Sequence, residues 1–524
     1  MDRSAHVPTP PGSPAPPASP RPPGSPAEEA VAAALAGVRP GLGSAYGAAL
    51  PGARAAVLGR LWRALAFEPL PWVAGRERSA GSLVVRTAGG GLLEGPLPDP
   101  YATGDHVTEL RLDGRPYRQA ARLMAALNVA HGEEFAAELD ESTASLALSR
   151  ATQPAAPEPD PPHTWGWEQR VVDGHPYHPN CRSRPGFSVA EQLAYAPEHR
   201  PVVELGLVAV RPGECLVTDG WPQELRGAGR ILIPVHPWQA AHVLKGEGVQ
   251  HSGFAAHPLM SLRTLAPVAG GAHVKTALST RLTSSVRDIS VYSVETAAAV
   301  SAFAEALAAR LDGRLHITRT LGAATAHSPD LAAVLREPPE RYADTAAGER
   351  VVPVAALTAT GLARSAAWRA EFARLALTVC LRVLDLGVAL EAHGQNLLVV
   401  LSPAGAPLRL VYRDLADIRI SPARLARHGL PVPPVSGRLI TDDVTVLRRK
   451  LFGSLVAGAL GATAGSAAAL AEDLGAAVAG LAPTADSGAL LTEPLPTKAL
   501  TLMRLSPGVP GDQWTQLPSP LTGG

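Results

Sequence analysis

Residues 174–187 read GHPYHPNCRSRPGF. Each of the two histidines, His175 and His178, precedes a proline, which disfavours helical conformation in the residue before it and predicts a stiff, extended loop. Arg182 and Arg184 follow, before a Gly-Phe pair at which the chain can turn. Two imidazoles and two guanidiniums on a rigid loop suit a polyanion such as a nucleoside triphosphate. A metal-binding or purely structural histidine loop is the alternative interpretation.

The composition excludes several classes of protein. A chain of 524 residues predicts two or three subdomains. Lys+Arg and Asp+Glu both number 47, so no global basic excess favours nucleic acid or an anionic membrane as a partner. The three cysteines lie far apart without a CxxC pair, which indicates a reduced, cytoplasmic protein without structural zinc.

The first 27 residues are rich in Pro, Ser, Gly and Ala, a composition that predicts a disordered tail. They lack the basic and apolar regions of a secretory signal. No apolar run approaches the roughly 20 residues of a membrane span, so we expect a soluble protein.

Hydrophobic periodicity divides the remainder into three portions. We expect an α+β portion at 28–150, a β-rich portion at 151–365 that begins with a Pro-rich linker, and a mainly helical portion at 366–524. In the first portion the expected helices are 28–47, 51–67, 119–131 and 135–150, and the expected strands are 82–87 and 107–112.

A cationic cluster is predicted on a β-hairpin in the second portion. Its strands, 259–267 and 274–282, flank the glycine turn AGGAH. Alternation along the second strand places one set of side chains on a shared face, namely Lys275, Ala277, Ser279, Arg281 and Thr283. The first strand carries Ser261, Arg263 and Thr264, and Arg287 lies just beyond the hairpin. A solvated strand face is the alternative, although such faces usually mix both signs of charge.

Polar residues gather at the end of the third portion's apolar helix, 366–386. The segment EAHGQN (391–396) precedes a second hairpin, which should bring Asn396 beside Asp414. Glu391, His393 and Gln395 would lie just outside this pair. Carboxylate and amide oxygens are suitable ligands for Mg²⁺. A satisfied polar network that caps the hairpin is the alternative.

The common nucleotide and hydrolase signatures are missing from the sequence. It contains no GxxxxGK[ST], no GxGxxG between strand and helix, no GxSxG and no HExxH. We therefore expect side chains, rather than a glycine-rich loop, to hold any bound nucleotide.

Taken together, these stretches resemble the NRPS-independent siderophore synthetases, the aerobactin-synthetase-like family. The resemblance spans roughly residues 120–505 and rests on GHPYHPNCRSRPGF, Ser261–Thr264, Lys275 and Arg287, EAHGQN, and Arg413-Asp414. The family often has lysine where Arg182 stands, and the N-terminal tail matches nothing in it.

The resemblance implies an α/β fold with a three-part, cupped-hand architecture of thumb, fingers and palm. It also implies an ATP- and Mg²⁺-dependent ligase of siderophore biosynthesis that adenylates a carboxylic acid and condenses it with an amine or alcohol. Nucleotide-binding residues would be His175, His178, Arg182, Arg184, Ser261, Arg263, Thr264, Lys275 and Arg287. Catalytic residues would be Arg287, Lys275 and His393, and the metal ligands would be Glu391, Asn396 and Asp414. We expect a cytoplasmic homodimer that acts on a carboxylic acid and a polyamine or hydroxamate nucleophile.

In this interpretation the Arg263, Lys275 and Arg287 cations and the His175/His178 loop supply positive charge to the phosphates. Two other functions stay open. A small-molecule phosphotransferase would release ADP, but Gln395 stands where such a kinase needs an aspartate base. A non-catalytic polycarboxylate- or siderophore-binding protein would need the cations without the acidic set. The acid itself (citrate, a citrate derivative, a succinyl-hydroxamate or 2-oxoglutarate) is undetermined by one sequence.

Overall fold

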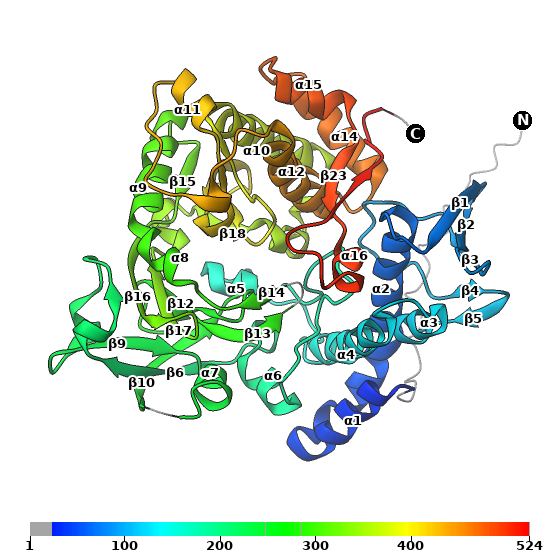
Figure 1. Ribbon diagram of the computed structural model, residues 1–524, viewed down its shortest axis with the longest axis horizontal. Coiled ribbons are helices and arrows are strands. Elements are labelled where there is room, and N and C mark those ends of the chain that lie inside the picture. The colour runs from blue at the N-terminus through cyan, green and yellow to red at the C-terminus, as the bar shows by residue number, and fades with distance from the viewer. Residues whose placement is uncertain (1–23, 247, 283–284, 523–524) are drawn as a thin grey trace, which may run out of the picture.

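The computed structural model describes residues 24–246, 248–282 and 285–522, and Figure 1 shows three regions in it. An N-terminal region lies at the right of the view, a large sheet at the lower left, and a mainly helical region above. Most of the predicted tail lies outside the described residues. Its last residues belong instead to helix α1 (Pro26–Val38), which Ser25 caps by accepting a hydrogen bond from the Glu28 amide.

Four helices form the body of the N-terminal region: α1, α2 (Gly43–Phe67), α3 (Ala120–Leu127) and α4 (Gly132–Ala151). The predicted division of residues 28–67 into the helices 28–47 and 51–67 is wrong. α1 ends at Val38, just before Pro40, and α2 continues through Pro51. A proline inside a helix costs one hydrogen bond, but buried apolar residues on both sides of Pro51, such as Leu50 and Leu58, pack into one core.

A five-stranded antiparallel sheet completes this region within the described residues. Its order follows the chain: β1 (Val73–Ser79), β2 (Ser82–Thr87), β3 (Leu92–Pro96), β4 (Leu110–Leu112) and β5 (Arg115–Tyr117). The strand predicted at 82–87 is confirmed by β2. The one predicted at 107–112 begins only at Leu110.

The second region contains a nine-stranded antiparallel sheet in the described part of the chain. In spatial order the strands are β7 (Leu216–Val217), β16 (Thr320–Ser328), β17 (Leu331–Arg336), β12 (His273–Thr276), β11 (Thr264–Pro267), β10 (Val249–Pro258), β6 (Val203–Val210), β9 (Arg230–Val235) and β8 (Arg226–Gly227). The accompanying helices are α5 (Thr164–Glu168), α6 (Val189–Tyr195), α7 (Pro237–His242), α8 (Val291–Glu295) and α9 (Ala297–Ala308).

The predicted cationic hairpin forms, but it is shorter than expected. β11 and β12 pair antiparallel with Thr264 opposite Lys275, across a turn that contains Gly270 and Gly271. β12 then ends at Thr276. The following residues form β13 (Leu278–Leu282), which pairs with β14 (Ser285–Arg287) in a separate sheet. The predicted shared face is therefore broken: Lys275 is buried and Arg281 is exposed, while Thr283 lies outside the described residues.

The third region is built around α10 (Ala366–Leu386), which has the predicted bounds. Its sheet has the order β15 (Leu315–Ile317), β21 (Pro407–Tyr412), β20 (Leu397–Leu401) and β18 (Arg350–Pro353). β20 and β21 form the second predicted hairpin, with Leu397 opposite Tyr412. The Arg413 amide donates to the Asn396 carbonyl at 3.0 Å, so Asn396 and Asp414 do lie at the same end of the hairpin. Short strands β19 (Val388–Ala389) and β22 (Arg419–Ile420) pair beside it.

Helices follow as predicted from residue 441 onward. They are α12 (Val444–Leu451), a π-helix η11 (Phe452–Leu460), α13 (Gly461–Ala464), α14 (Ala467–Val478) and α15 (Ala485–Thr492). A shorter helix, α11 (Pro422–Arg427), precedes them. In the described residues no single helix is long and apolar enough to cross a membrane, and Val444–Ala464 with Ala467–Val478 reaches that length only as a pair bent by 117°.

The last elements of the chain return to the N-terminal region. After the unpredicted hairpin strand β23 (Leu495–Lys498) comes α16 (Leu500–Leu505), and β24 (Trp514–Leu517) then pairs with β23. Leu502 and Leu505 belong to the same buried core as α2 and α4. Glu68, at the end of α2, accepts hydrogen bonds from the amides of Thr501 (3.2 Å) and Leu502 (2.7 Å).

We predict that Glu68 makes the stability of the fold depend on pH. Burial raises the pKa of Glu68 to about 7, although the backbone hydrogen bonds oppose the shift. The folded chain therefore holds this proton more tightly than the unfolded chain, and the stability contribution falls as pH rises from about 4.5 to 7. In urea titrations at pH 5 and 7.5, the wild type should lose about 3 kcal/mol relative to Glu68→Gln.

Glu29→Gln, at an exposed position of α1, provides the control and should follow the wild type at both pH values. Equal pH dependence in the wild type and in Glu68→Gln would contradict the prediction.

Candidate functional site

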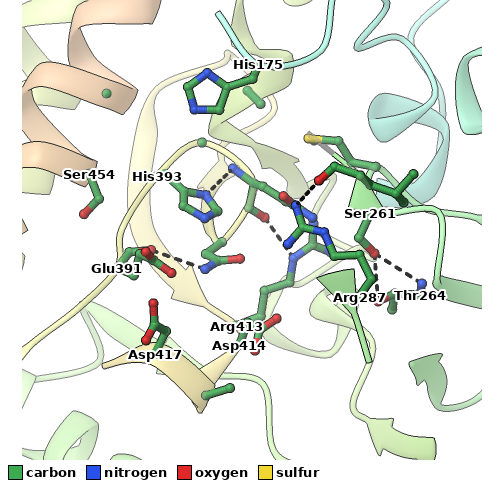
Figure 2. Close-up of a pocket in the computed structure, with 18 of the residues that line it drawn as sticks. His175, Ser261, Thr264, Arg287, Glu391, His393, Arg413, Asp414, Asp417 and Ser454 are labelled. Atoms are coloured by element: carbon green, nitrogen blue, oxygen red, sulfur yellow. Dashed lines mark hydrogen bonds between the residues drawn. The ribbon is translucent and has the colours of Figure 1, made fainter. Parts of the chain in front are cut away.

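A cavity of about 1380 Å³ opens where the three regions meet. In Figure 2, Ser261, Thr264 and Arg287 lie on one side of the view, and Glu391, Asp417 and Ser454 lie on the other. His175 and His393 project between these two groups. The π-helix η11 contributes Gly453, Ser454 and Gly458 to the wall. The cavity is larger than the 300–1,000 Å³ typical of a small-molecule pocket, so it has room for more than one ligand.

An ion cluster of two cations and one carboxylate joins the second and third regions at this cavity. Lys275 Nζ, on β12, lies 3.1 and 2.9 Å from the two carboxylate oxygens of Asp414, and Arg336 Nη2, at the end of β17, lies 3.1 Å from Oδ1. Asp414 follows β21 directly and has a left-handed backbone, with φ of 72°. Sequence reasoning missed Arg336, since nothing in its strand marks it as different from other surface arginines.

Burial controls the charge of this cluster. It lowers the pKa of Lys275 to about 7, although attraction by Asp414 opposes the shift. Burial alone would raise the pKa of Asp414, but Arg336 and Lys275 hold it well below its usual range. Asp414 is thus ionised at neutral pH, whereas Lys275 can gain or lose its proton there.

Two further arginines stand beside the cluster. Arg263 donates through Nη1 to the carbonyls of Arg287 (2.5 Å) and Asp288 (2.6 Å), and Arg287 donates to the Leu282 carbonyl at 3.2 Å. Burial and the neighbouring Arg287 lower the pKa of Arg263 to about 10, so it stays cationic at neutral pH. With Lys275 and Arg336 these arginines gather near Asp414, and Asp288 and Glu391 are close enough to act on them as well. The arrangement can bind an anion.

Ser261 and Thr264 bond to each other at the edge of the cationic group. The Ser261 hydroxyl donates to Thr264 Oγ1 at 2.9 Å and accepts from the Thr264 amide at 3.2 Å. Between them Leu262 has a φ of 62°, which turns the chain so that these polar groups line the cavity. The structure therefore brings five predicted nucleotide-binding residues to one wall: Ser261, Arg263, Thr264, Lys275 and Arg287.

The histidines of the site share one hydrogen-bonding pattern. His175 Nδ1 accepts from the amides of Tyr177 (3.2 Å) and His178 (3.1 Å), and His393 Nδ1 accepts from the Gln395 amide at 3.2 Å. A neutral imidazole that accepts at Nδ1 carries its proton on Nε2. Enclosure lowers the pKa of His393, and enclosure together with His178 lowers that of His175 well below its ordinary value. Both rings are therefore neutral N–H donors.

This finding corrects the expectation that the His175/His178 loop supplies positive charge. Burial also lowers the pKa of His178, to about 3, and its Nδ1 accepts from the Asn180 amide at 3.0 Å. His178 is fully buried and does not line the cavity. Its Nε2 has no hydrogen-bond partner within the described residues.

The two arginines of the loop contact protein groups. Arg184 Nη2 lies 2.6 Å and Arg182 Nη1 3.4 Å from the buried carboxylate of Glu198. Arg182 Nε also donates to the Val172 carbonyl at 2.8 Å, and the Ser149 hydroxyl donates to Glu198 at 2.7 Å. Burial would raise the pKa of Glu198, but the two arginines hold it well below its usual range. These contacts account for both arginines as parts of a buried ion cluster, and their role toward a nucleotide stays a prediction.

The three predicted metal ligands line the same cavity, and each of them contacts other protein groups. Glu391 Oε1 pairs with Lys450 Nζ at 3.1 Å and with Lys498 Nζ at 3.3 Å. Asn396 donates to the Glu391 carbonyl at 3.3 Å, and Asp414 is held by the cations already described. Among the described residues, no three His, Cys, Asp or Glu side chains form a group that could hold a metal ion. Protein cations already pair with both carboxylates of the predicted set, so its role as a Mg²⁺ site stays a prediction.

Sequence reasoning also missed Glu168, which ties the two hairpins together. Its carboxylate accepts from Arg413 Nη1 at 2.7 Å and from the Met260 amide at 3.0 Å. Arg413 in turn donates to the Gln395 carbonyl at 3.0 Å. Glu168 is the last residue of α5, shortly after the Pro-rich linker, and only the nearby Trp165 and Trp167 distinguish it in the sequence.

We predict that Glu198→Gln destabilises the chain by about 3–5 kcal/mol at pH 7, because it leaves Arg182 and Arg184 buried without a counter-charge. Chemical denaturation measures the change. Glu191→Gln, seven residues earlier and partly exposed, should cost less than about 1 kcal/mol. Equal costs for the two variants would show that the arginines are not held by Glu198.

Two family models match the chain in succession. Residues 163–359 match the IucA / IucC family, and residues 366–509 match the model described as ferric iron reductase FhuF-like transporter. A 2-[(L-alanin-3-ylcarbamoyl)methyl]-3-(2-aminoethylcarbamoyl)-2-hydroxypropanoate synthase of Staphylococcus aureus is 24% identical over 357 residues, which are 54% of this chain and 57% of that protein. The citryl-spermidine/3,4-dihydroxybenzoyl-citryl-spermidine:spermidine ligase of Bacillus anthracis is 24% identical over 312 residues, 48% and 50% of the two chains. This chain thus spans about half the length of the curated relatives it matches.

Solved structures match nearly the whole fold. The petrobactin biosynthesis protein AsbB of Bacillus anthracis has a TM-score of 0.74 at 18% identity, over 95% of this chain and 98% of that one. The ATP-bound aerobactin synthetase IucA of Klebsiella pneumoniae has a TM-score of 0.66 at 19% identity, over 90% and 99%. The predicted fold class, a mixed helix-and-sheet architecture of three parts, is confirmed.

Proposed function

Because the chain belongs to the NRPS-independent siderophore synthetase family, we propose that it is an ATP-dependent ligase that joins a carboxylic acid to an amine or alcohol. The acid would attack the α-phosphate to form an acyl-adenylate and pyrophosphate, and the nucleophile would then displace AMP. The observation that carries this proposal is the concentration of Lys275, Arg263, Arg287 and Arg336 on the cavity wall, where Asp414 pairs with Lys275 and Arg336.

The cationic wall matches the electrostatic demand of adenylation. An anionic carboxylate must approach an anionic phosphate while pyrophosphate departs, and fixed positive charges lower the cost of both events. Arg263 and Arg287 are held by backbone carbonyls, so their guanidiniums are preorganised before any ligand arrives. Ser261 and Thr264 would add hydroxyl donors to the phosphate or ribose.

Neutral imidazoles would orient the substrates without adding charge. His175 and His393 each present Nε2–H toward the cavity, as a consequence of the amides that occupy Nδ1. We assign His393, together with Arg287, to the carboxylate substrate. The second step then needs mainly proximity, which is worth up to about 7–11 kcal/mol.

A requirement for Mg²⁺ stays a prediction. Mg²⁺ is commonly held by one or two carboxylates together with substrate phosphates and water. Glu391, Asn396 and Asp414 remain the proposed ligands, but lysines and Arg336 already engage both carboxylates. We therefore derive no step through the metal.

The names of the relatives support the proposed substrate class. Those of the Staphylococcus aureus and Bacillus anthracis proteins describe citrate-derived amides and a spermidine acceptor. We propose citrate or a citrate derivative as the acid and an amine as the nucleophile. The three cysteines, Cys181, Cys215 and Cys380, are free and buried, which agrees with the cytoplasmic location that we propose. A homodimer stays a prediction.

We predict ATP–pyrophosphate exchange that depends on one acid from a panel of citrate, succinate, 2-oxoglutarate and a hydroxamate half-acid. The assay is run with and without Mg²⁺, and the acid that supports exchange names the substrate class. Arg287→Ala should abolish exchange while the melting temperature stays close to that of the wild type. Formation of ADP in place of AMP and pyrophosphate would support a phosphotransferase, and no turnover with any acid would contradict the ligase proposal.

We further predict that nucleotide affinity falls as pH rises from 7.5 to 9. Phosphate binding favours the protonated amine, and Lys275 has a pKa of about 7 in the free chain, so binding above that pH must take up a proton. The nucleotide affinity should fall by at most about tenfold for each pH unit. Lys275→Arg, which is cationic throughout, should bind with little dependence on pH. Lys275→Met should bind weakly at every pH, and calorimetry in buffers of different ionisation enthalpy measures the proton uptake. A wild-type affinity independent of pH would contradict the assignment.

A further inference from the structure

We propose that Arg60, on α2, is a positioning residue for the reaction, because it holds the loop of residues 173–181 so that His175 presents its Nε2–H to the cavity. The part that concerns turnover rests on the proposed function. Neither family model reaches α2, since their matches cover residues 163–359 and 366–509. The assignment therefore depends on the geometry of this chain alone.

One guanidinium contacts the loop at three separated points. Arg60 Nε donates to the Pro176 carbonyl at 2.9 Å, and Nη2 donates to the Asp173 carbonyl at 3.3 Å. Nη1 contacts Cys181 Sγ at 3.4 Å. Asp173 precedes the two His-Pro steps, Pro176 belongs to the first of them, and Cys181 follows the second. All three residues lie more than 110 positions from Arg60 in the sequence. The side chain thus spans the base of the loop that carries His175.

The contacts surround the bond that sets the His175 tautomer. Pro176, whose carbonyl Arg60 binds, lies between His175 and Tyr177, whose amide donates to His175 Nδ1. A shift of the Pro176 peptide would therefore move the amides of Tyr177 and His178 away from the ring. Without those amides neither ring nitrogen is preferred as the protonated one. Arg60 also lines the cavity, but its hydrogen bonds all go to residues of this loop, so we assign its effect to the loop.

Burial without a counter-ion distinguishes Arg60 from a stabilising salt bridge. Its exposed fraction is 7%, and it forms no ion pair within the described part of the chain. The carboxylate that feels its charge, Asp173, forms its ion pair with Arg150 instead. A buried charge without an ion pair of its own is costly, so a salt bridge does not account for Arg60. Burial is the main cause of the lowered pKa of His175, and the positive charges of Arg60 and Arg63 add to it.

Other side chains hold the loop elsewhere and would keep it folded when Arg60 is altered. The Arg63 guanidinium lies 4.3 Å from the ring centroid of Tyr177, and Arg150 Nε pairs with the Asp173 carboxylate at 3.0 Å. From α4, the Ser142 hydroxyl donates to the Pro179 carbonyl at 2.9 Å. Loss of Arg60 should therefore release the His175 segment without unfolding the loop.

The test compares Arg60→Met and Arg60→Lys with the matched control Arg76→Met. Arg76 also donates to backbone carbonyls of the α2 end, those of Leu65 and Glu68, but it touches neither the loop nor the cavity. Lysine keeps the positive charge of Arg60 but cannot contact Asp173, Pro176 and Cys181 at the same time, because it lacks the planar guanidinium. Thermal melting identifies the variants that fold.

Two readouts are measured on the folded variants. Ring ¹⁵N NMR at pH 7.5, with His175→Gln to assign the signal, reports the His175 tautomer without any nucleotide. ATP–pyrophosphate exchange reports turnover. We expect a single Nε2–H tautomer for His175 in the wild type and in Arg76→Met. In both Arg60 variants we expect mixed tautomers and a maximal exchange rate lowered roughly 10- to 100-fold, with a smaller change in the KM for ATP.

The two readouts separate failure of this inference from failure of the proposed function. A wild type without exchange would refute the ligase proposal, while the NMR comparison would still decide whether Arg60 sets the His175 tautomer. The inference is overturned if a folded Arg60 variant keeps the wild-type His175 signal and exchange within twofold, or if Arg76→Met loses as much as the Arg60 variants do.

Discussion

The position of the site depends on one partly buried carboxylate, Asp414, which neutralises cations from a different sheet. Lys275 and Arg336 project from neighbouring strands of the nine-stranded sheet, and their charges could not be buried there without a counter-ion. Asp414 follows the hairpin of the third region. The ion cluster thereby ties the two regions together at the wall of the cavity, which the N-terminal region completes.

The same interaction explains why this wall of the cavity carries positive charge that the protein does not fully neutralise. Asp414 pairs with Lys275 and Arg336, whereas Arg263 and Arg287 donate to backbone carbonyls, so the wall keeps positive charge that solvent or an anion must balance. Lys275 absorbs part of this excess because its pKa lies near neutrality. The opposite wall is different: Glu391 and Asp417 share the ammonium of Lys450, and acids there are paired within the protein. The asymmetry of the two walls gives a bound ligand a preferred direction.

Local patterns predicted the elements that carry their own signals. α10, β2 and the hairpin of β20 and β21 followed from periodicity and turn residues, and the hairpin correctly placed Asn396 beside Asp414. The predictions that were wrong concern residues whose partners lie far away in the sequence. The strand after Lys275 breaks at Ala277 because Leu278–Leu282 pairs with β14, and Arg182 and Arg184 turn to Glu198. The charge state of His175 was mispredicted for the same reason, since enclosure by other segments keeps it neutral. No single-sequence pattern reveals a counter-ion such as Arg336 or a brace such as Arg60.

The return of α16 to the N-terminal core has a consequence for how the protein is made. Ala499, Leu502 and Leu505 complete a core whose other buried residues come from the first 190 positions, and Glu68 caps the amides of that returning helix. A ribosome must therefore synthesise more than 500 residues before this core can close. Until then the nascent N-terminal helices expose an apolar surface that only the end of the chain can cover, and a cell that makes this protein must shield that surface throughout elongation.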